Sequence, residues 1–463
     1  MLSRPTSRSA PGVESATEGT PALPPWDRGA LRWLLVVAAA GFALRVAWAI
    51  YAAREPVGLI DPSLYSVHAR AIADGEGYAW FFGEDTAYYP PGYPISLGVV
   101  LWFVRLLPLP DGLPGVAAAY NVVLGTATIV LVAELGRRML RSTAAGVVAA
   151  AIVAVWPNLV VHSSLVLSET LFNALVVATL VVLAAPAPWR ERHFRPARLV
   201  AAGVLLAAAT YVRPISALLL LALPWALVRA GFGWRRSLVA VGVVTGTAVA
   251  LILPWTIRNL IVLDSPVLLS TNFGDNLCIG HHPGATGHFE LLESCLDGYD
   301  PDLSRAELEV ERNSRETRRA VRFALRNPGE ELELLPKRFW YTVNSDHDGV
   351  DASESYGADQ WLPRDPKAGL KRLSDLWWCS VLAVSALSLL LLRRREGPIR
   401  LLAPTILALI APPLIFFGDP RFHVPVVPFI AVLAALGLTT AARALVGARR
   451  PAAPRTAAPV PAG

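Results

Sequence analysis

The feature that most constrains this chain is a series of apolar blocks of about 20 residues. They cover residues 31–53, 115–135, 144–162, 167–185, 199–228, 237–255, 375–392, 398–417 and 424–442, with a shorter block at 95–107. About 20 consecutive apolar residues form a helix that is long enough to cross the hydrocarbon core of a bilayer. The sequence therefore predicts an all-α polytopic membrane protein.

Composition supports this prediction and excludes other classes. Hydrophobic residues make up 54% of the 463 residues and charged residues only 17%, whereas a soluble chain carries about a quarter charged residues. Three cysteines are too few for a disulfide framework. A soluble enzyme, a disulfide scaffold and a disordered protein are thus excluded. The net charge of +6 lies in loops between the blocks, so no nucleic-acid partner is expected.

The block at 199–228 is too long for one span and contains Arg213-Pro214. Proline disfavours a helical conformation in the residue before it, and an arginine at mid-bilayer costs at least about 2.5 kcal/mol. We therefore expect two short helices that turn at 211–214.

The short basic loops set the predicted topology. Short cytoplasmic loops carry an excess of Lys and Arg, and four loops here are rich in arginine, at 137–141, 190–198, 229–236 and 393–400. These four loops lie on the same side of the membrane only if the segment 95–107 does not cross it and is juxtamembrane or re-entrant. This predicts ten spans in the plasma membrane, with both termini cytoplasmic and the loops 54–114 and 256–374 outside.

The same pattern divides the chain into five parts. They are a disordered cytoplasmic tail (1–29), an N-terminal transmembrane core with the first outer loop (30–256), an extracytoplasmic loop subdomain (257–374), C-terminal transmembrane helices (375–445) and a second disordered cytoplasmic tail (446–463). Within the loop subdomain, helical patterning is predicted near 303–326 and 329–341.

Two acidic residues at the outer ends of these blocks are candidates for chemistry. Asp61 precedes Pro62, which suits the first helical position, so Asp61 is expected either to be an N-cap or to act as a general base. Glu169 lies at the outer edge of a span, where it needs a partner. Either Ser168 caps that helix and the negative charge of Glu169 interacts favourably with the positive N-terminal end of the helix dipole, or Glu169 contacts an acceptor or a metal.

Three arginines are predicted on the extracytoplasmic side of the membrane, although Lys and Arg are usually enriched on the cytoplasmic side: Arg213, Arg258 and Arg421. Each could place its charged head in water while its stem covers apolar surface. Their shared side instead indicates an anionic partner, because arginine matches the geometry of phosphate with two parallel hydrogen bonds.

A glycine-rich outer loop at 272–287 follows the block at 237–255. The spacing of its histidines fits no zinc pattern, so no metal site is predicted. Cys278 and Cys295 share the oxidising side, which leaves a disulfide between them open.

The order of these motifs resembles the GT-C superfold of polytopic glycosyltransferases, in particular the family 39-like group of protein O-mannosyltransferases and the lipid A aminoarabinose transferase. The resemblance covers about 30–445 and rests on Asp61 with Tyr65, Gly75-Glu76-Gly77-Tyr78, Pro90-Pro91-Gly92-Tyr93-Pro94, Ser168-Glu169, Arg213-Pro214, Pro254-Trp255 with Arg258-Asn259, the loop that begins at Asn272, and Pro420-Arg421-Phe422.

The resemblance implies a GT-C-type helical core with juxtamembrane helices, a larger outer loop subdomain and an extracytoplasmic active site. It implies inverting transfer of a sugar from a polyprenyl monophosphate in the membrane to an unidentified protein, lipid or glycan acceptor. No cofactor is required, although a divalent cation stays open. Asp61 matches the general base; several relatives have a second acid directly after it, where this chain has Pro62. The implied substrate-binding residues are Arg258 and Arg421, then Arg213, with Tyr65, Tyr93, Glu169 and Asn272.

Two other functions stay open from the sequence. A transporter or flippase of a lipid-linked saccharide would place ionisable groups near the midplane and contain paired repeats. Arg45, which we expect to extend toward the interface, and the break at Arg213 favour it, but no repeat is visible. In a non-catalytic assembly subunit, the motifs would only be structural. For a transferase, we expect Asp61, Arg258 and Arg421 to converge on one outward cavity that also opens laterally to lipid.

Overall fold

The computed structural model describes residues 23–80, 83–290, 292, 295, 302–393 and 395–448, and this part of the chain is helical without a β-ladder. Six helical stretches in it are long and apolar enough to cross a membrane. They are α1 (Arg28–Ala52), α4 (Leu113–Leu140), α11 (Trp234–Val262), α17 (Arg364–Leu392), the segment Pro398–Ile415 with η4 (Pro398–Leu401), α18 (Leu402–Ile410) and α19 (Pro412–Ile415), and the segment Pro420–Val446 with η5 (Pro420–Val426) and α20 (Val427–Ala448). The predicted polytopic all-α class is confirmed.

Shorter apolar helices complete the core. A pair bent by 63° joins α5 (Thr143–Ala154) to the segment Pro157–Ser164, which contains α6 (Pro157–Val161) and η1 (His162–Ser164). The others are α7 (Glu169–Leu183), α9 (Pro196–Val212), and η2 (Pro214–Leu218) with α10 (Leu219–Arg229). The predicted break is confirmed, because α9 ends before Arg213, whose backbone is extended. These helices and the six long stretches lie in the apolar blocks predicted to form ten spans, and in the described residues six of them, or seven with the bent pair counted as one, are long and apolar enough to cross a membrane.

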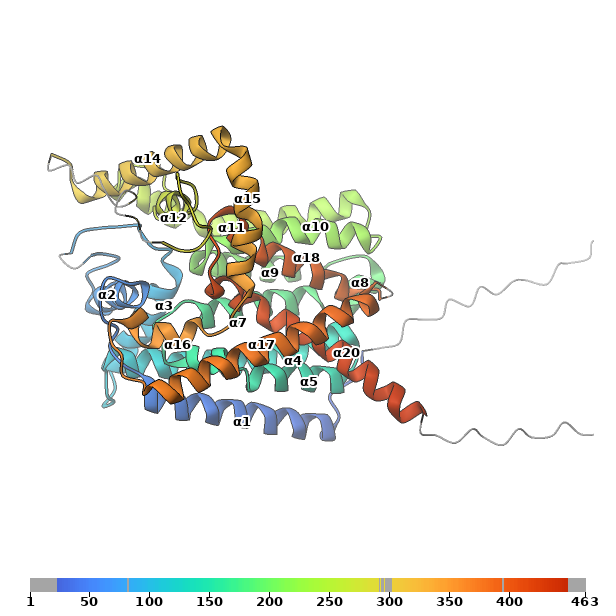
Figure 1. Ribbon diagram of the computed structural model, residues 1–463. Coiled ribbons are helices and arrows are strands. Elements are labelled where there is room, and N and C mark those ends of the chain that lie inside the picture. The colour runs from blue at the N-terminus through green and yellow to red at the C-terminus, as the bar shows by residue number, and fades with distance from the viewer. Residues whose placement is uncertain are drawn as a thin grey trace, which may run out of the picture.

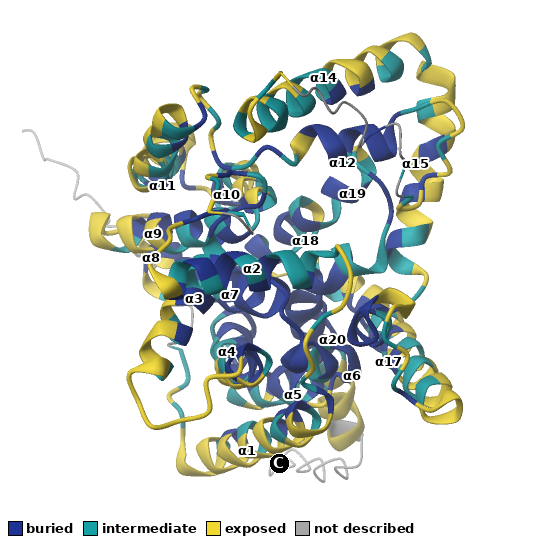
Figure 2. Cartoon of the chain, turned by 90° about the vertical axis from the view of Figure 1, so that its left-hand side faces the viewer, coloured by how far each residue is buried: buried dark blue, intermediate teal, exposed yellow. Residues whose placement is uncertain are grey.

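The long helices run across Figure 1, and the buried centre lies between them, whereas α1, α11 and α17 have mostly exposed faces (Figure 2). Only 22% of the apolar window is buried in each of these three helices. Their exposed side chains include Trp33, Leu35, Val239 and Leu387. Apolar faces of this kind are suited to contact with lipid.

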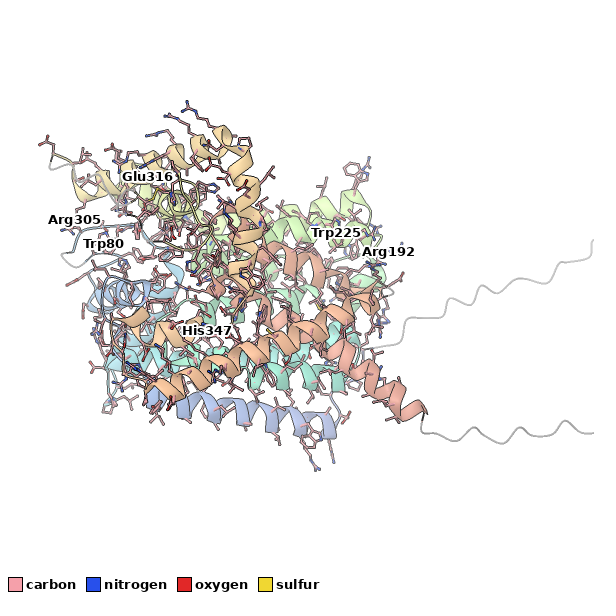
Figure 3. The ribbon with its side chains drawn as sticks, in the orientation of Figure 1. Trp80, Arg192, Trp225, Arg305, Glu316 and His347 are labelled. Atoms are coloured by element: carbon pink, nitrogen blue, oxygen red, sulfur yellow. A yellow bond between two sulfur atoms is a disulfide. The ribbon has the colours of Figure 1, made fainter. Side chains whose placement is uncertain are left out.

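The basic loops meet at one end of the helical core. Arg236 donates to the backbone carbonyl of Arg192 at 3.3 Å, and Arg400 donates to the carbonyl of Arg229. Figure 3 labels Arg192 at this end, and it labels Trp80 and Arg305 at the opposite end. The separation of basic loops from outer loops on which the topology prediction depends is therefore present in the fold.

Two helices of the first outer loop lie side by side. Helix α2 (Asp61–Asp74) is seen end-on in Figure 1 and lengthwise in Figure 2, so it lies across the direction of the spans. Helix α3 (Gly92–Arg105) packs against it, and Arg105 pairs with Asp74 at 2.5 Å. Helix α3 has 14 residues, fewer than a span requires. The expected juxtamembrane helices are thus found, although α3 begins three residues before the predicted block.

The outer loop subdomain consists of α12 (Phe273–Gly280), α14 (Arg305–Arg326), α15 (Pro328–Val343), α16 (Asp348–Ser353) and η3 (Ser355–Gly357), while α8 (Pro186–Glu191) lies at the basic end. The helical patterning predicted near 303–326 and 329–341 is confirmed by α14 and α15. A capping box between Ser304 and Glu307 begins α14. Most of both predicted tails lies outside the described residues, but α1 begins at Arg28 and α20 continues to Ala448.

We expect substitution of Gly98 to separate α2 from α3. A Cβ atom at Gly98 would lie 2.7 Å from the carbonyl oxygen of Ala69 and 2.8 Å from the side chain of Ile72. Gly98→Leu should lower the free energy of unfolding by about 2 kcal/mol, the usual range for an overpacked core. Thermal unfolding of the purified protein in detergent measures this. Gly115→Leu on α4, where nothing lies within 4 Å of the added atom, is the control. Equal melting temperatures for both variants would contradict the prediction.

Candidate active site

The first acidic candidate, Asp61, lies in the first turn of α2. The prediction that it is the N-cap is wrong, because Ile60 holds that position and no side chain caps the helix. The Asp61 carboxylate points elsewhere: Oδ1 accepts a hydrogen bond from the Tyr89 hydroxyl at 2.8 Å, and Oδ2 accepts one from Nη1 of Arg421. Both oxygens of the carboxylate are therefore occupied.

Arg421 joins two acids from distant parts of the chain. It lies in η5, where Asp419 accepts a hydrogen bond from its backbone N–H at 2.9 Å. Its Nη1 reaches Asp61, and its Nε donates to Oε1 of Glu169. Asp61 and Arg421 are separated by 360 residues. One guanidinium thus brings α2, α7 and η5 to a single point.

Glu169 completes the site from the first turn of α7. Its Oε1 also accepts a hydrogen bond from Arg213, and Nε of Arg213 donates to the hydroxyl of Ser168 at 2.9 Å. Ser168 is the N-cap residue by position, but its side chain caps no backbone N–H, so that part of the capping prediction is wrong. Glu169 is buried, and its Oε2 has no hydrogen-bond partner among the described residues.

Asp61, Glu169, Arg213 and Arg421 form what we call the four-charge cluster. Its two guanidinium groups balance its two carboxylates. Tyr65 packs beside it, with its ring 5.0 Å from that of Tyr89 and 5.6 Å from that of Tyr93. Burial and the charge of Asp61 raise the pKa of Tyr65 to about 12, so its hydroxyl is neutral near pH 7. The cluster is thus electrically neutral, with an aromatic wall on the α2 side.

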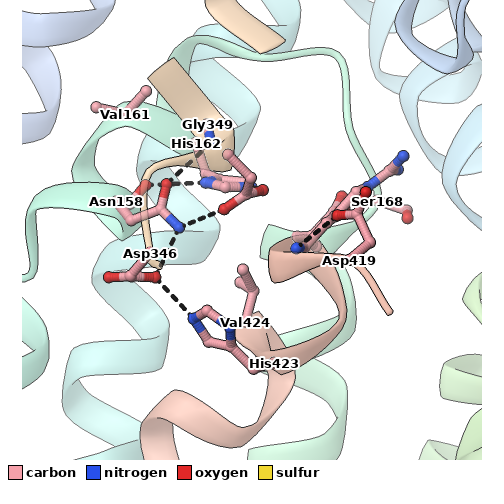
Figure 4. Close-up of polar contacts among 12 residues, drawn as sticks. Asn158, Val161, His162, Ser168, Asp346, Gly349, Asp419, His423 and Val424 are labelled. Carbon is pink, nitrogen blue, oxygen red and sulfur yellow. Dashed lines mark hydrogen bonds and ion pairs between the residues drawn. The ribbon is translucent and has the colours of Figure 1, made fainter. Parts of the chain in front are cut away.

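A second polar cluster holds η5 in place, and the sequence analysis missed it. Asn158 donates to Asp346 at 2.8 Å and to Asp348 at 2.7 Å, while His423 contacts Asp346 at 2.9 Å (Figure 4). The ring of His423 stacks on Trp378 with their centroids 4.1 Å apart. All these residues are buried. Because His423 lies two residues after Arg421, this cluster fixes the segment that carries the guanidinium.

Arg258 and Asn272 have other partners. Arg258 on α11 donates to the carbonyl of Thr86 at 2.6 Å and to Asp85 at 2.6 Å. The backbone N–H of Asn272 donates to the carbonyl of Tyr88 at 3.2 Å. Of the three groups expected to converge, Asp61 and Arg421 are in direct contact. Arg258 instead contacts residues of the first outer loop and two neighbours on its own helix, Trp255 and Asn259.

Glu309 on α14 is a further connecting residue that sequence reasoning missed. Its carboxylate accepts hydrogen bonds from the hydroxyls of Thr86 and Thr271, each at 2.6 Å, and from the backbone N–H of Ala87 at 2.9 Å. A lone glutamate on a highly charged helix carries no local signal of such a role. Arg258 and Glu309 together fasten the loop that supplies Tyr89.

The expected snorkelling of Arg45 is wrong. Its side chain is buried and donates to the backbone carbonyls of Gly41 at 3.0 Å, Ala154 at 2.8 Å and Val153 at 3.2 Å. Arg45 therefore ties α1 to α5. These contacts give it a packing role inside the helical core.

The outer histidines are dispersed over separate contacts. His281 contacts Glu331 at 2.7 Å, whereas His282 and His288 contact neighbouring backbone carbonyls. In the described residues, one group of three possible metal ligands lies within 4.8 Å, formed by Cys278, Cys295 and Glu316. The two cysteines are bonded to each other, so the disulfide that the sequence left open is formed and their sulfurs are not thiolate ligands.

The architecture is that of the GT-C superfold. The oligosaccharyltransferase AglB of Archaeoglobus fulgidus in the apo form matches with a TM-score of 0.53 at 16% identity, over 90% of this chain and 52% of AglB. ArnT of Cupriavidus metallidurans in the apo state matches with a TM-score of 0.52 at 14% identity, over 90% of this chain and 63% of ArnT. The predicted GT-C fold is confirmed.

Another AglB structure, in complex with an inhibitory peptide and a dolichol-phosphate, matches with a TM-score of 0.51 at 16% identity, over 91% of this chain and 52% of that chain. The chain thus spans about half the length of AglB. No protein-family model matches the sequence, and no curated protein matches it. At these identities the likeness establishes the fold alone.

Asp419 should make stability depend on pH. Burial, with a contribution from the charge of Asp348, raises the pKa of Asp419 to about 6 from its ordinary 3.8. The folded protein therefore holds this proton more tightly than the unfolded chain, and stability from this group is lost as pH rises from about 4 through about 6.

Asp419→Asn removes the charge and keeps an oxygen for the Arg421 backbone N–H. Relative to the unchanged protein, the variant should have a free energy of unfolding that is higher by up to about 3 kcal/mol at about pH 7.5 and almost the same at about pH 4. Thermal melts at the two pH values measure the difference. A gain that is the same at both pH values would show that Asp419 does not titrate in this range.

Proposed function

We propose that this protein is a membrane glycosyltransferase that moves a sugar from a polyprenyl monophosphate to an acceptor hydroxyl at the extracytoplasmic face. The observation that carries the proposal is the four-charge cluster, in which two carboxylates and two guanidinium groups from distant segments meet on a GT-C fold. Arginine is suited to bind a phosphate, and a carboxylate is suited to take a proton.

The transfer step that these groups support is a single displacement. The acceptor oxygen forms a bond to C1 of the sugar from the face opposite the phosphate, and its proton passes to Asp61. The bond between C1 and the phosphate oxygen breaks, and its electron pair stays on the leaving polyprenyl phosphate. Arg421 and Arg213 stabilise the added negative charge on that phosphate. Configuration at C1 is inverted.

The other candidates take positioning roles in this proposal. Arg258 holds the first outer loop through Asp85 and Thr86, and Asn272 holds the neighbouring segment through Tyr88. Tyr65 and Tyr93 are buried and pack on each other with their rings 5.6 Å apart, which holds α2 against α3 beside the cluster. A polyprenyl phosphate donor is supported by the dolichol-phosphate of the AglB complex.

A transfer assay tests the proposal. Purified protein is mixed with radiolabelled polyprenyl-phosphate sugars and a membrane extract as the acceptor source. Asp61→Asn should lower the transfer rate by about 10²–10⁴, the usual contribution of a general base. Asp74→Asn, which makes the same change at the other end of α2, should transfer normally. Unchanged transfer by Asp61→Asn would remove Asp61 as the base, and the absence of transfer by the unchanged protein with every donor would contradict the function itself.

The sidedness of the site has its own test. The basic loops should lie in the cytoplasm, as positively charged short loops do, and α2 should lie outside. Glu76→Cys and His193→Cys, each in a Cys379→Ser background, place an exposed thiol at opposite ends of the core. A membrane-impermeant maleimide should label the Glu76→Cys variant in intact cells and the His193→Cys variant only after permeabilisation. The reverse pattern would overturn the proposed orientation.

A further inference from the structure

We infer that the donor phosphate and the Asp61 carboxylate compete for Arg421, so that the donor binds first and releases the base for the acceptor. This inference rests on the proposed function. It concerns the order of binding, which the proposed reaction alone does not fix.

Both carboxylate oxygens of Asp61 already have hydrogen-bond partners. A general base must offer an oxygen to the acceptor proton, yet Oδ1 of Asp61 is bonded to the Tyr89 hydroxyl at 2.8 Å and Oδ2 is bonded to Arg421. An acceptor that arrives before the donor therefore meets a carboxylate whose two oxygens are both in use. Loss of one of these two partners frees a hydrogen-bonding position on Asp61 for the acceptor hydroxyl.

The four-charge cluster has no net charge to attract a phosphate. Arg213 and Arg421 are balanced by Glu169 and Asp61, so the cluster has no excess positive charge for a phosphate. A guanidinium matches phosphate as well as carboxylate geometry, and the phosphodiester of a polyprenyl-phosphate sugar carries one negative charge, as a carboxylate does. A phosphate that enters the cluster is therefore bound strongly only if one carboxylate gives up its guanidinium.

The two carboxylates of the cluster differ in how firmly they are held. The Glu169 side chain is 1% exposed and is paired with both arginines, whereas the Asp61 side chain is 32% exposed and is paired with one arginine, Arg421, beside the neutral hydroxyl of Tyr89. Asp61 also lies at the beginning of α2, where no side chain caps the helix. Asp61 is thus the member of the cluster that can leave Arg421 without exposing a buried, unpaired charge.

The consequence is that the base becomes active only when the donor is in place. When the donor phosphate takes the place of Asp61 beside Arg421, Oδ2 of Asp61 loses its guanidinium partner. That oxygen is then free to accept the proton of the acceptor hydroxyl.

Binding measurements on the full chain in detergent test this inference without requiring turnover. The probe is farnesyl monophosphate, a short polyprenyl monophosphate, titrated by calorimetry. If the carboxylate competes with the phosphate, Asp61→Asn should bind the probe about tenfold more tightly, which corresponds to about 1.4 kcal/mol. Asp74→Asn, which changes an acid paired with Arg105 on the same helix, should bind as the unchanged protein does. Adding Arg421→Gln to Asp61→Asn should remove the gain.

The opposite results are equally clear. Equal or weaker binding by Asp61→Asn would overturn the inference, as would the absence of binding to the unchanged protein or a gain that survives Arg421→Gln. The proposed function fails separately: tighter binding by Asp61→Asn without any sugar transfer by the unchanged protein would support the competition and contradict the transferase. Sugar transfer by the unchanged protein, with no tighter binding by Asp61→Asn, would support the transferase function and contradict the inferred order of binding.

Discussion

The contact of Arg421 with both Asp61 and Glu169 is the interaction on which the rest of the site depends. It joins the start of α2, the start of α7 and the segment before α20. A charged side chain at the edge of an apolar core is costly without a partner. Each member of the four-charge cluster therefore requires the others, and loss of Arg421 would leave Asp61 with Tyr89 alone and Glu169 with Arg213 alone.

Much of the surrounding structure serves to hold that guanidinium in place. His423 is fixed from one side by Asp346 at 2.9 Å and by the carbonyl of Thr342 at 2.7 Å. Gly418 lies so close to α15 that an added Cβ would stand 2.2 Å from the Arg338 carbonyl oxygen. Arg421 thus lies between two anchored positions, which limits the freedom of its backbone. Within the four-charge cluster, Asp61 is the most exposed member, with 32% of its side chain accessible.

The sequence predicted the helical core, the break at Arg213 and the juxtamembrane pair because hydrophobic periodicity and proline act locally. It also identified all members of the four-charge cluster, since a charge beside an apolar span is conspicuous. It could not separate Arg421 from Arg258, because both are outward arginines near prolines and differ only in their partners. The contact of Asn158 with Asp346 spans 188 residues, and that of Glu309 with Thr86 spans 223 residues. No local pattern encodes such pairs.

The location of the charges also bears on what kind of membrane protein this is. A transport pathway needs ionisable groups that meet the substrate at mid-membrane. Arg45 is a buried charged residue within the long helix α1. Its guanidinium donates to three backbone carbonyls of α1 and α5, so this group joins the two helices. The members of the four-charge cluster lie instead at helix ends: Asp61 and Glu169 are in the first turns of α2 and α7, and Arg213 lies between α9 and η2. An arrangement of this kind favours chemistry at the membrane surface over passage through it.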